Sequence, residues 1–351
     1  MFSVTCKSIK NYLCLSLKNY MDRFKNIAKY LFFFAVGIFL FAWVYREYDL
    51  TGFVATLKEL KWGWVFLSLL LALLSHFVRA IRWNMLIEPL GYKARLSNTF
   101  SSVLVLYATN LVIPRGGELA RCTVLSRYEK IPFGKLVGTV VTERTTDTLF
   151  LLILVFSTIF SQIGVFEQFM INNPQFGNNF GFLFSAWFWI LGFVIGMASL
   201  VGLYKFRHRL KQISFIGKLY DLLFNFFEGI KSIKKLKHPG WFIFLSILIY
   251  VLYFFMMYVV FFSYAPTNHV PAIAGLTAFI MGGLAMLMPV QGGIGAWHFM
   301  VIETLAIYGL AENYGKDFAL ISHTSMNLML LIAGAIAFIA LPFINRKKQT
   351  D

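Results

Sequence analysis

The stretch that decides the fold runs from Val103 to Asp147 and reads VLVLYATNLVIPRGGELARCTVLSRYEKIPFGKLVGTVVTERTTD. An apolar run, Thr99 to Ile113, leads into its first break and has only about fifteen residues, whereas a helix needs roughly 20 to cross a bilayer core. The run is followed by Pro114, which ends a helix, and by a glycine pair, which permits a tight turn. We therefore expect a re-entrant hairpin over residues 99–130 that enters the membrane and turns back.

The residues after this break favour a new helix whose first turn can bind an anion. A helix start presents unpaired N–H groups and a partial positive charge, and Arg115 and Arg121 lie beside this one. We therefore predict a binding site for a phosphate or carboxylate at Arg115, Gly116, Gly117, Glu118 and Arg121. The alternative is structural, with the arginine capping loop carbonyls and Glu118 pairing with it.

Three charged residues follow inside apolar sequence, in the segment ERTTD. Glu143, Arg144 and Asp147 would lie roughly 12 to 18 Å deep in a helix that enters near Lys135. Charges at that depth normally face a bundle interior or a wet cavity. Their spacing of three and four residues allows one helix flank to carry all three. They are candidates for substrate binding, and a buried ion-pair network that locks two helices is the equal alternative.

The composition indicates a polytopic membrane protein. Of the 351 residues, 58% are hydrophobic, only 14% are charged and 39 are Phe. The net charge of +16 comes from basic residues between apolar segments, a pattern that follows the positive-inside rule and argues against nucleic-acid binding. The three Cys and six His show no metal-binding spacing. We expect no metal site, no cofactor and no catalytic residue.

The predicted fold is all-α, with about six crossings and two re-entrant helical hairpins. The distribution of basic residues between the apolar segments divides the chain into five parts. They are a basic cytosolic N-terminal tail (1–29), a first membrane half (30–204), a basic amphipathic cytosolic linker (205–240), a second membrane half (241–345) and a cytosolic tail (346–351).

Several segment boundaries within this plan rest on charge alone. Arg46 to Lys61 is expected to form an outer loop, and the crossing Trp62 to Val78 to end in a basic cytosolic loop that begins at Arg79 and Arg82. Ala311 to Asp317 is expected to form a short external loop before the last crossing, Phe318 to Leu341.

The second half of the sequence contains the same kind of break as the first, an apolar run followed by proline and a glycine pair. Residues 272–310 are expected to form a second hairpin, broken by proline and by Gly292 and Gly293. The order crossing, hairpin, crossing in opposite orientation is typical of transporters with inverted repeats, whose broken segments point to the substrate site. His323 and Asn327, four apart on the last helix, are expected to face the position of Glu143 by pseudo-symmetry, with a polar helix contact as the commoner alternative.

Three motifs in order carry a resemblance to a known family. NLVIPRGGELAR (Asn110 to Arg121), ERTTD (Glu143 to Asp147) and PVQGGIGAWHFM (Pro289 to Met300) resemble the lysylphosphatidylglycerol synthase transmembrane region, also called the flippase-like domain family. The resemblance covers residues 30 to 343. It departs from the pattern at Ala296, Trp297 and His298, where a more charged pair is expected, so no role is assigned to His298.

The resemblance implies a multi-pass protein of the bacterial inner membrane, with both termini cytosolic, that binds an anionic phospholipid or lipid-linked group or moves it between leaflets. Its expected partners are this lipid, the membrane, a homo-oligomer or a lipid-synthesis protein. Full-length synthases carry a soluble aminoacyl-transfer domain after the membrane region. No such domain follows in this sequence, so we do not expect an enzyme. The alternatives are a membrane transferase acting on lipid headgroups and a non-transporting accessory subunit of a lipid-synthesis complex.

Overall fold

The computed structural model describes residues 31–113, 116–162, 233–288 and 290–346, together with 191 and 194. These residues are helical, and no strand occurs among them. The N-terminal tail (1–29), most of residues 163–204 of the expected first membrane half and most of the expected linker 205–240 lie outside the described residues.

The described helices confirm the all-α class. In chain order they are Leu31–Val44, α2 (Leu50–Glu59), α3 (Trp62–Ile87), η1 (Glu88–Leu90), α4 (Leu96–Val112), α5 (Gly117–Glu129), α6 (Phe133–Ser161), α12 (Pro239–Tyr258), η3 (Val259–Ser263), η4 (Ala265–Thr267), α13 (Ala272–Ala285), η5 (Gln291–Gly293), α14 (Ala296–Ile307) and α15 (Glu312–Ile344). Three described helices are long and apolar enough to cross a membrane: α3 with η1, α12 with η3, and α15. The six crossings and the inverted repeat stay predictions.

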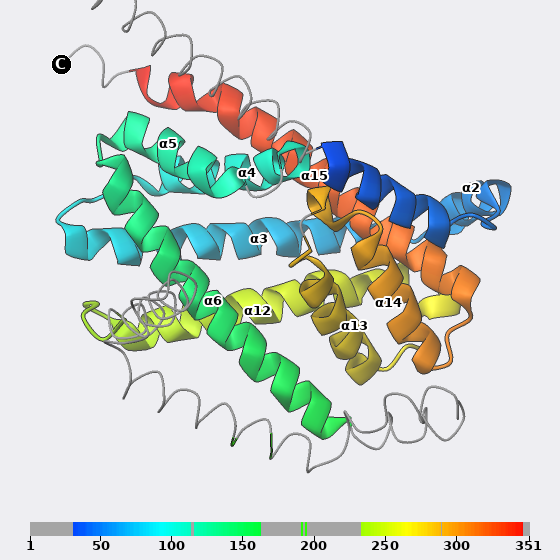
Figure 1. Ribbon diagram of the computed structural model, residues 1–351. Coiled ribbons are helices and arrows are strands. Elements are labelled where there is room, and N and C mark those ends of the chain that lie inside the picture. The colour runs from blue at the N-terminus through cyan, green and yellow to red at the C-terminus, as the bar shows by residue number, and fades with distance from the viewer. Residues whose placement is uncertain are drawn as a thin grey trace, which may run out of the picture.

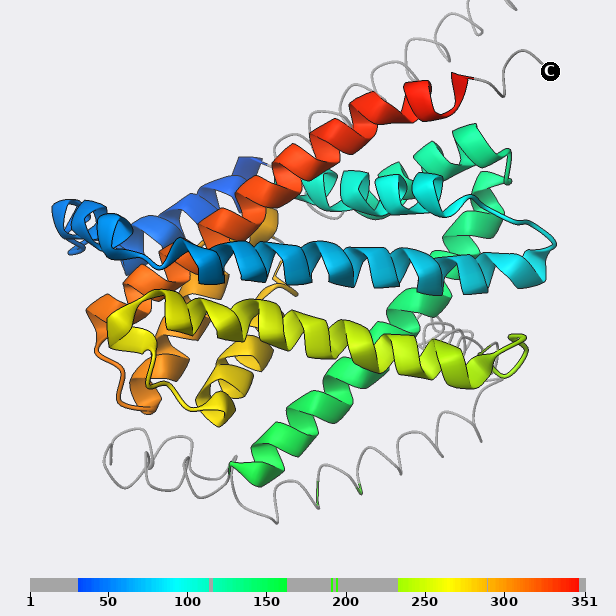
Figure 2. The same cartoon turned by 180° about the vertical axis from the view of Figure 1, so that it is seen from behind.

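The long helices set the frame of the molecule. α3 and α12 lie side by side, and α6 crosses them obliquely (Figures 1 and 2). α4 and α5 form a hairpin beside α15, while α13 and α14 form a second hairpin that also contacts α15. We call the end that carries the α3–α4 and α5–α6 connections the basic end, because Lys93, Arg95, Lys130 and Lys135 lie there (left in Figure 1).

A helical hairpin, α4 and α5, lies at the first predicted break, and its re-entrant course in the membrane stays a prediction. Ile113 caps α4 in an extended conformation, with φ −120° and ψ 108°, because a residue before proline avoids the helical region. α5 begins at Gly117, one residue before the expected Glu118. A Cβ at Gly117 would lie 2.1 Å from the carbonyl oxygen of Leu106, so only glycine allows the two helices to approach this closely.

The second break depends on glycine backbone conformation. Gly292, Gly293 and Gly295 have φ values of 56°, 73° and 81°, a region that residues with a Cβ rarely adopt. A Cβ on Gly292 would lie 2.9 Å from Cδ2 of Leu111, near the end of α4. The two hairpin breaks therefore lie against each other.

The boundary of the second predicted crossing was wrong. α3 continues past Val78 to Ile87, so Arg79 and Arg82 lie inside the helix and are buried, not in a basic loop. They remain charged inside apolar surroundings because acidic residues of α6 pair with both of them. The basic connection between α3 and α4 is therefore shorter than expected and runs from Glu88 to Arg95.

Two expected outer loops contain helix. Residues 50–59 form α2, whose start is capped by the Asp49 carboxylate accepting from the Thr51 N–H. α15 begins at Glu312 and includes the expected loop Ala311 to Asp317. Charge does not interrupt this helix because the Lys316 ammonium pairs with Glu312, while Asp317 accepts a hydrogen bond from the Tyr48 hydroxyl.

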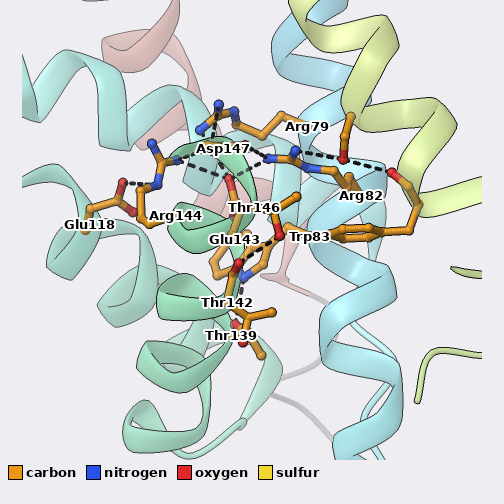
Figure 3. Close-up of polar contacts among 12 residues, drawn as sticks. Arg79, Arg82, Trp83, Glu118, Thr139, Thr142, Glu143, Arg144, Thr146 and Asp147 are labelled. Atoms are coloured by element: carbon orange, nitrogen blue, oxygen red, sulfur yellow. Dashed lines mark hydrogen bonds and ion pairs between the residues drawn. The ribbon is translucent and has the colours of Figure 1, made fainter. Parts of the chain in front are cut away.

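Apolar packing holds both ends of the molecule. At the basic end, Trp83, Leu125 and Leu136 join α3, α5 and α6 in one buried cluster. At the opposite end, the rings of Phe261 and Phe318 stack with centroids 3.9 Å apart and an interplanar angle of 2°. The polar residues of the candidate site lie between these two clusters on the middle of α3 and α6 (Figure 3).

Candidate functional site

α6 supplies two carboxylates and one arginine to the centre of the molecule. Glu143 is fully buried, Asp147 is nearly so, and Arg144 keeps 41% of its side chain exposed. The Arg144 guanidinium lies 3.1 Å from Glu143 Oε1 and 3.6 Å from Asp147 Oδ2. The expected sharing of one helix flank by these three residues is thus confirmed, and it brings them within ion-pair distance.

α3 contributes two arginines to the same place. Arg79 lies 3.2 Å from both Glu143 and Asp147. Arg82 lies 2.6 Å from Asp147 Oδ1 and 3.4 Å from Glu143 Oε1, and it also donates to the Ser246 hydroxyl on α12 at 3.1 Å. α3 and α6 are therefore joined by four short contacts between buried charges.

The first hairpin completes the group. Arg121 on α5 lies 2.9 Å from Glu143 Oε2 and 2.7 Å from Glu118 Oε2. The other oxygen of Glu118 lies 3.1 Å from Arg144 Nε. The structure therefore brings together Glu118, Arg121, Glu143, Arg144 and Asp147, five of the residues predicted for the site. With the two arginines of α3 we call them the charge cluster, whose members other than Arg121 are labelled in Figure 3.

The charge cluster is not electrically balanced. It holds four arginines (79, 82, 121 and 144) and three carboxylates (118, 143 and 147), a surplus of one positive charge among the described residues. Arginine remains protonated in proteins, so all four guanidinium groups keep their positive charge. Arg144 is the most exposed member of the cluster, and its guanidinium lies within 3.6 Å of all three carboxylates. A planar guanidinium suits a phosphate or carboxylate.

Aromatic side chains enclose the arginines. The Trp83 ring lies 4.4 Å from the Arg121 guanidinium, and its Nε1–H donates to the Thr139 hydroxyl at 2.9 Å. On the other side, Arg79 lies within 6 Å of the rings of Tyr107 and Tyr253, whose hydroxyls are 3.0 Å apart. These contacts exclude water from most of the cluster and fix the orientation of the arginines.

Two of the N–H groups at the start of α5, which were expected to be free, donate to other groups of the protein. The Gly117 N–H donates to the Asn110 side-chain oxygen at 2.9 Å, and the Gly116 N–H donates to the Ile113 carbonyl at 3.0 Å. Arg115 lies outside the described residues. Anion binding at this hairpin therefore depends on the arginine side chains more than on these two backbone groups.

The second hairpin forms a separate polar group. His323 Nε2–H donates to the Gly292 carbonyl at 2.8 Å, which leaves Nδ1 to accept from the Asn327 amide at 3.1 Å. The His323 ring also stacks on Trp297, with centroids 4.9 Å apart. The Gly293 N–H donates to the Val290 carbonyl at 3.3 Å.

The second-hairpin group supports its own break and does not join the charge cluster. Among the described residues, no hydrogen bond or ion pair links His323 or Asn327 to that cluster. His323 bonds the second break directly and Asn327 bonds His323, as expected for a polar helix contact.

Arg79 and Arg82 are the site residues that the sequence interpretation missed. The signal was present, because Trp83 and the run Met85 to Ile87 continue the apolar pattern beyond both arginines. Their spacing of three residues places them on one face of that extended helix. In the described part of the chain, no group of three or more His, Cys, Asp or Glu side chains is placed to hold a metal ion.

Comparison with known proteins agrees with the motifs. Residues 27–334 match the family described as the lysylphosphatidylglycerol synthase TM region. A similar protein from Methanocaldococcus jannaschii, called "UPF0104 membrane protein MJ1595", is 25% identical over 309 residues, which span 81% of this chain and 87% of that protein. No solved structure gives a significant match. The chain therefore belongs to the family of the lysylphosphatidylglycerol synthase TM region and is a membrane protein.

Proposed function

We propose that this protein is flippase-like and that it binds the anionic headgroup of a phospholipid or lipid-linked group and moves it between leaflets. The observation that carries the proposal is the surplus positive charge of the cluster, four arginines against three carboxylates, with Arg144 as its most exposed member. An uncompensated charge inside a membrane is energetically unfavourable, and an anionic ligand would neutralise the surplus charge of the cluster. The family name, which refers to synthesis of a phospholipid, is consistent with a lipid ligand.

The arrangement of the hairpins supports movement of the ligand. Each described half contains a helix, a Gly-broken hairpin and a second helix: α3, α4/α5, α6 and then α12, α13/α14, α15. We infer that the halves form an inverted repeat, in which the hairpins alternate access to the two leaflets. The contact between Leu111 and Gly292 is where one hairpin would transmit its movement to the other.

The proposal includes an orientation in the membrane. The basic end would face the cytosol of a bacterial inner membrane, since Lys and Arg are enriched in the connections there. We also propose that both chain termini are cytosolic, as the basic residues of the sequence suggest. No residue is assigned a catalytic role, and binding in a homo-oligomer or with a lipid-synthesis protein is compatible with the same site.

The test is leaflet exchange of fluorescent anionic and zwitterionic phospholipids in proteoliposomes. We expect exchange above that of empty vesicles, lost in Arg144→Ala and in Arg115→Ala, and retained at least in part in Arg144→Lys. Arg127→Ala is the matched control, because Arg127 is an exposed arginine of α5 whose described contact is with the Tyr128 ring.

Folding of every variant is checked by size-exclusion chromatography before reconstitution. Absence of exchange with any lipid, also under an imposed proton gradient, would overturn the transport proposal. That result would leave a membrane transferase or an accessory subunit as the function to test. Equal exchange by the wild type and Arg144→Ala would show that the charge cluster does not bind the substrate.

A further inference from the structure

A second polar site lies at the end of the molecule opposite the basic end. A cavity of about 200 Å³ opens there between the end of helix Leu31–Val44, α14 and the start of α15. Its walls include two aromatic side chains, Trp43 and Phe299, and five charged ones from the three segments. None of these residues belongs to the charge cluster or to the polar group at the second break.

The charges around this cavity leave one carboxylate without a partner. Lys316 pairs with Glu312 at 2.7 Å, and Arg46 pairs with Glu47 at 3.2 Å. Glu303 has no ion pair within 4 Å among the described residues, so the lining carries one surplus negative charge. The surplus charge of this lining is negative, whereas that of the charge cluster is positive, so the lining attracts a cation.

The two aromatic rings of the lining indicate which kind of cation would bind there. Trp43 and Phe299 have ring centroids 5.6 Å apart, and Glu303 follows Phe299 by four residues, so both lie on the same face of α14. Aromatic faces attract organic ammonium groups through the ring quadrupole, with Trp the strongest, whereas hard metal ions require several oxygen ligands. A ligand that carries a phosphate but no ammonium group would meet a lining of net negative charge and be disfavoured.

We propose that this cavity binds an ammonium group, with the Glu303 carboxylate as its ion-pair partner and Trp43 and Phe299 as its aromatic walls. Both a lipid headgroup, such as that of phosphatidylcholine or phosphatidylethanolamine, and a free organic amine carry this chemistry. The site stands on its own observations and does not depend on leaflet exchange.

The test measures binding to the full chain purified in an uncharged maltoside detergent, by saturation-transfer NMR. The probes are choline, ethanolamine, and phosphatidylcholine and phosphatidylglycerol with short chains, below their critical micelle concentrations. We expect choline, ethanolamine and the phosphatidylcholine to bind, and the phosphatidylglycerol, which lacks an ammonium group, not to bind at this cavity. Glu303→Gln and Trp43→Leu should each weaken binding of the ammonium probes by about tenfold.

Glu59→Gln is the matched control, because it removes the same charge from the exposed end of α2, outside the cavity. Unchanged binding in this variant together with loss in Glu303→Gln would support the site. Binding of choline without binding of the short-chain lipid would assign the cavity to free organic amines. Absence of transfer to every ammonium probe, or equal binding in Glu303→Gln, would overturn the proposal. Failure of the exchange assay would not affect these outcomes, because no transport is measured.

Discussion

Arg121 and Glu143 form an ion pair of 2.9 Å in which neither side chain is exposed. Arg121 belongs to the first hairpin and Glu143 to the middle of α6, so this contact fixes the hairpin to a helix that also pairs with α3. Glu143 is within 3.4 Å of four arginines (79, 82, 121 and 144). A single carboxylate thus joins three elements, and removing it affects all of them.

Glu143→Gln should strongly destabilise the protein. The substitution keeps the shape of the side chain but leaves buried arginines on α3 and α5 without their shared counter-charge, and breaking a buried ion pair costs about 3–5 kcal/mol. Thermal unfolding in detergent, followed by size-exclusion chromatography, measures the effect. Glu59→Gln, on the exposed end of α2, should unfold like the wild type. Equal unfolding temperatures for both variants would contradict this account of Glu143.

Arg82→Ala and Arg144→Ala should differ in their effect on stability. Arg82 is fully buried and lies 2.6 Å from Asp147, so its removal leaves a buried carboxylate with a weaker counter-charge and should cost about 3–5 kcal/mol. Arg144 is 41% exposed, and its removal makes the cluster neutral, so a loss of about 1 kcal/mol or less is expected. Chemical denaturation of the two variants in the same detergent tests the order. A larger loss in Arg144→Ala would contradict it.

The hairpins could be predicted from the sequence because they depend on local chemistry. Proline restricts the preceding residue, and Gly292 and Gly293 adopt φ values that other residues avoid, so both breaks are visible without knowledge of the packing. The clustering of Glu118 and Arg121 with the α6 triad was also accessible, since all five residues lie near the same predicted hairpin.

The burial of Arg79 and Arg82 could not be predicted from charge patterns. An arginine near the end of an apolar segment normally belongs to a loop. The apolar residues that follow indicate a longer helix, but the burial of both arginines depends on the position of Glu143 and Asp147 on another helix. In the same way, the sequence does not indicate that the Asn110 side-chain oxygen accepts a hydrogen bond from the Gly117 N–H, a group that was expected to be free. Tertiary contacts decided both cases.

Gly334→Ala should disrupt the packing of the first hairpin on α15. A Cβ at this position would lie 2.3 Å from the Ala108 Cβ and 2.9 Å from the Leu104 carbonyl oxygen, both on α4, so the helices must separate. Overpacking of this kind costs about 1–3 kcal/mol. Gly138→Ala, inside α6 with nothing within 4 Å of its Cβ, should instead stabilise by about 0.5–1 kcal/mol through helix propensity. Thermal unfolding should therefore move in opposite directions, and a shift of the same sign would contradict the prediction.

Asn98 and Asn345 should show energetic coupling. Each amide donates to the oxygen of the other, at 2.9 and 2.8 Å, and the buried pair joins the start of α4 to the end of α15 at the basic end. Removing either partner leaves the side-chain oxygen of the other without its amide donor, while Asn98 still donates to Glu129 and Asn345 to the Leu341 carbonyl. Asn98→Ala and Asn345→Ala should therefore each destabilise by about 1–3 kcal/mol, and the double variant by less than their sum. A double-mutant cycle from denaturant unfolding should give a coupling energy of about 0.5–3 kcal/mol. Asn268→Ala, at an exposed turn position, should add to Asn345→Ala without coupling. Additive effects of Asn98→Ala and Asn345→Ala would show that the two amides do not hold the first hairpin to α15.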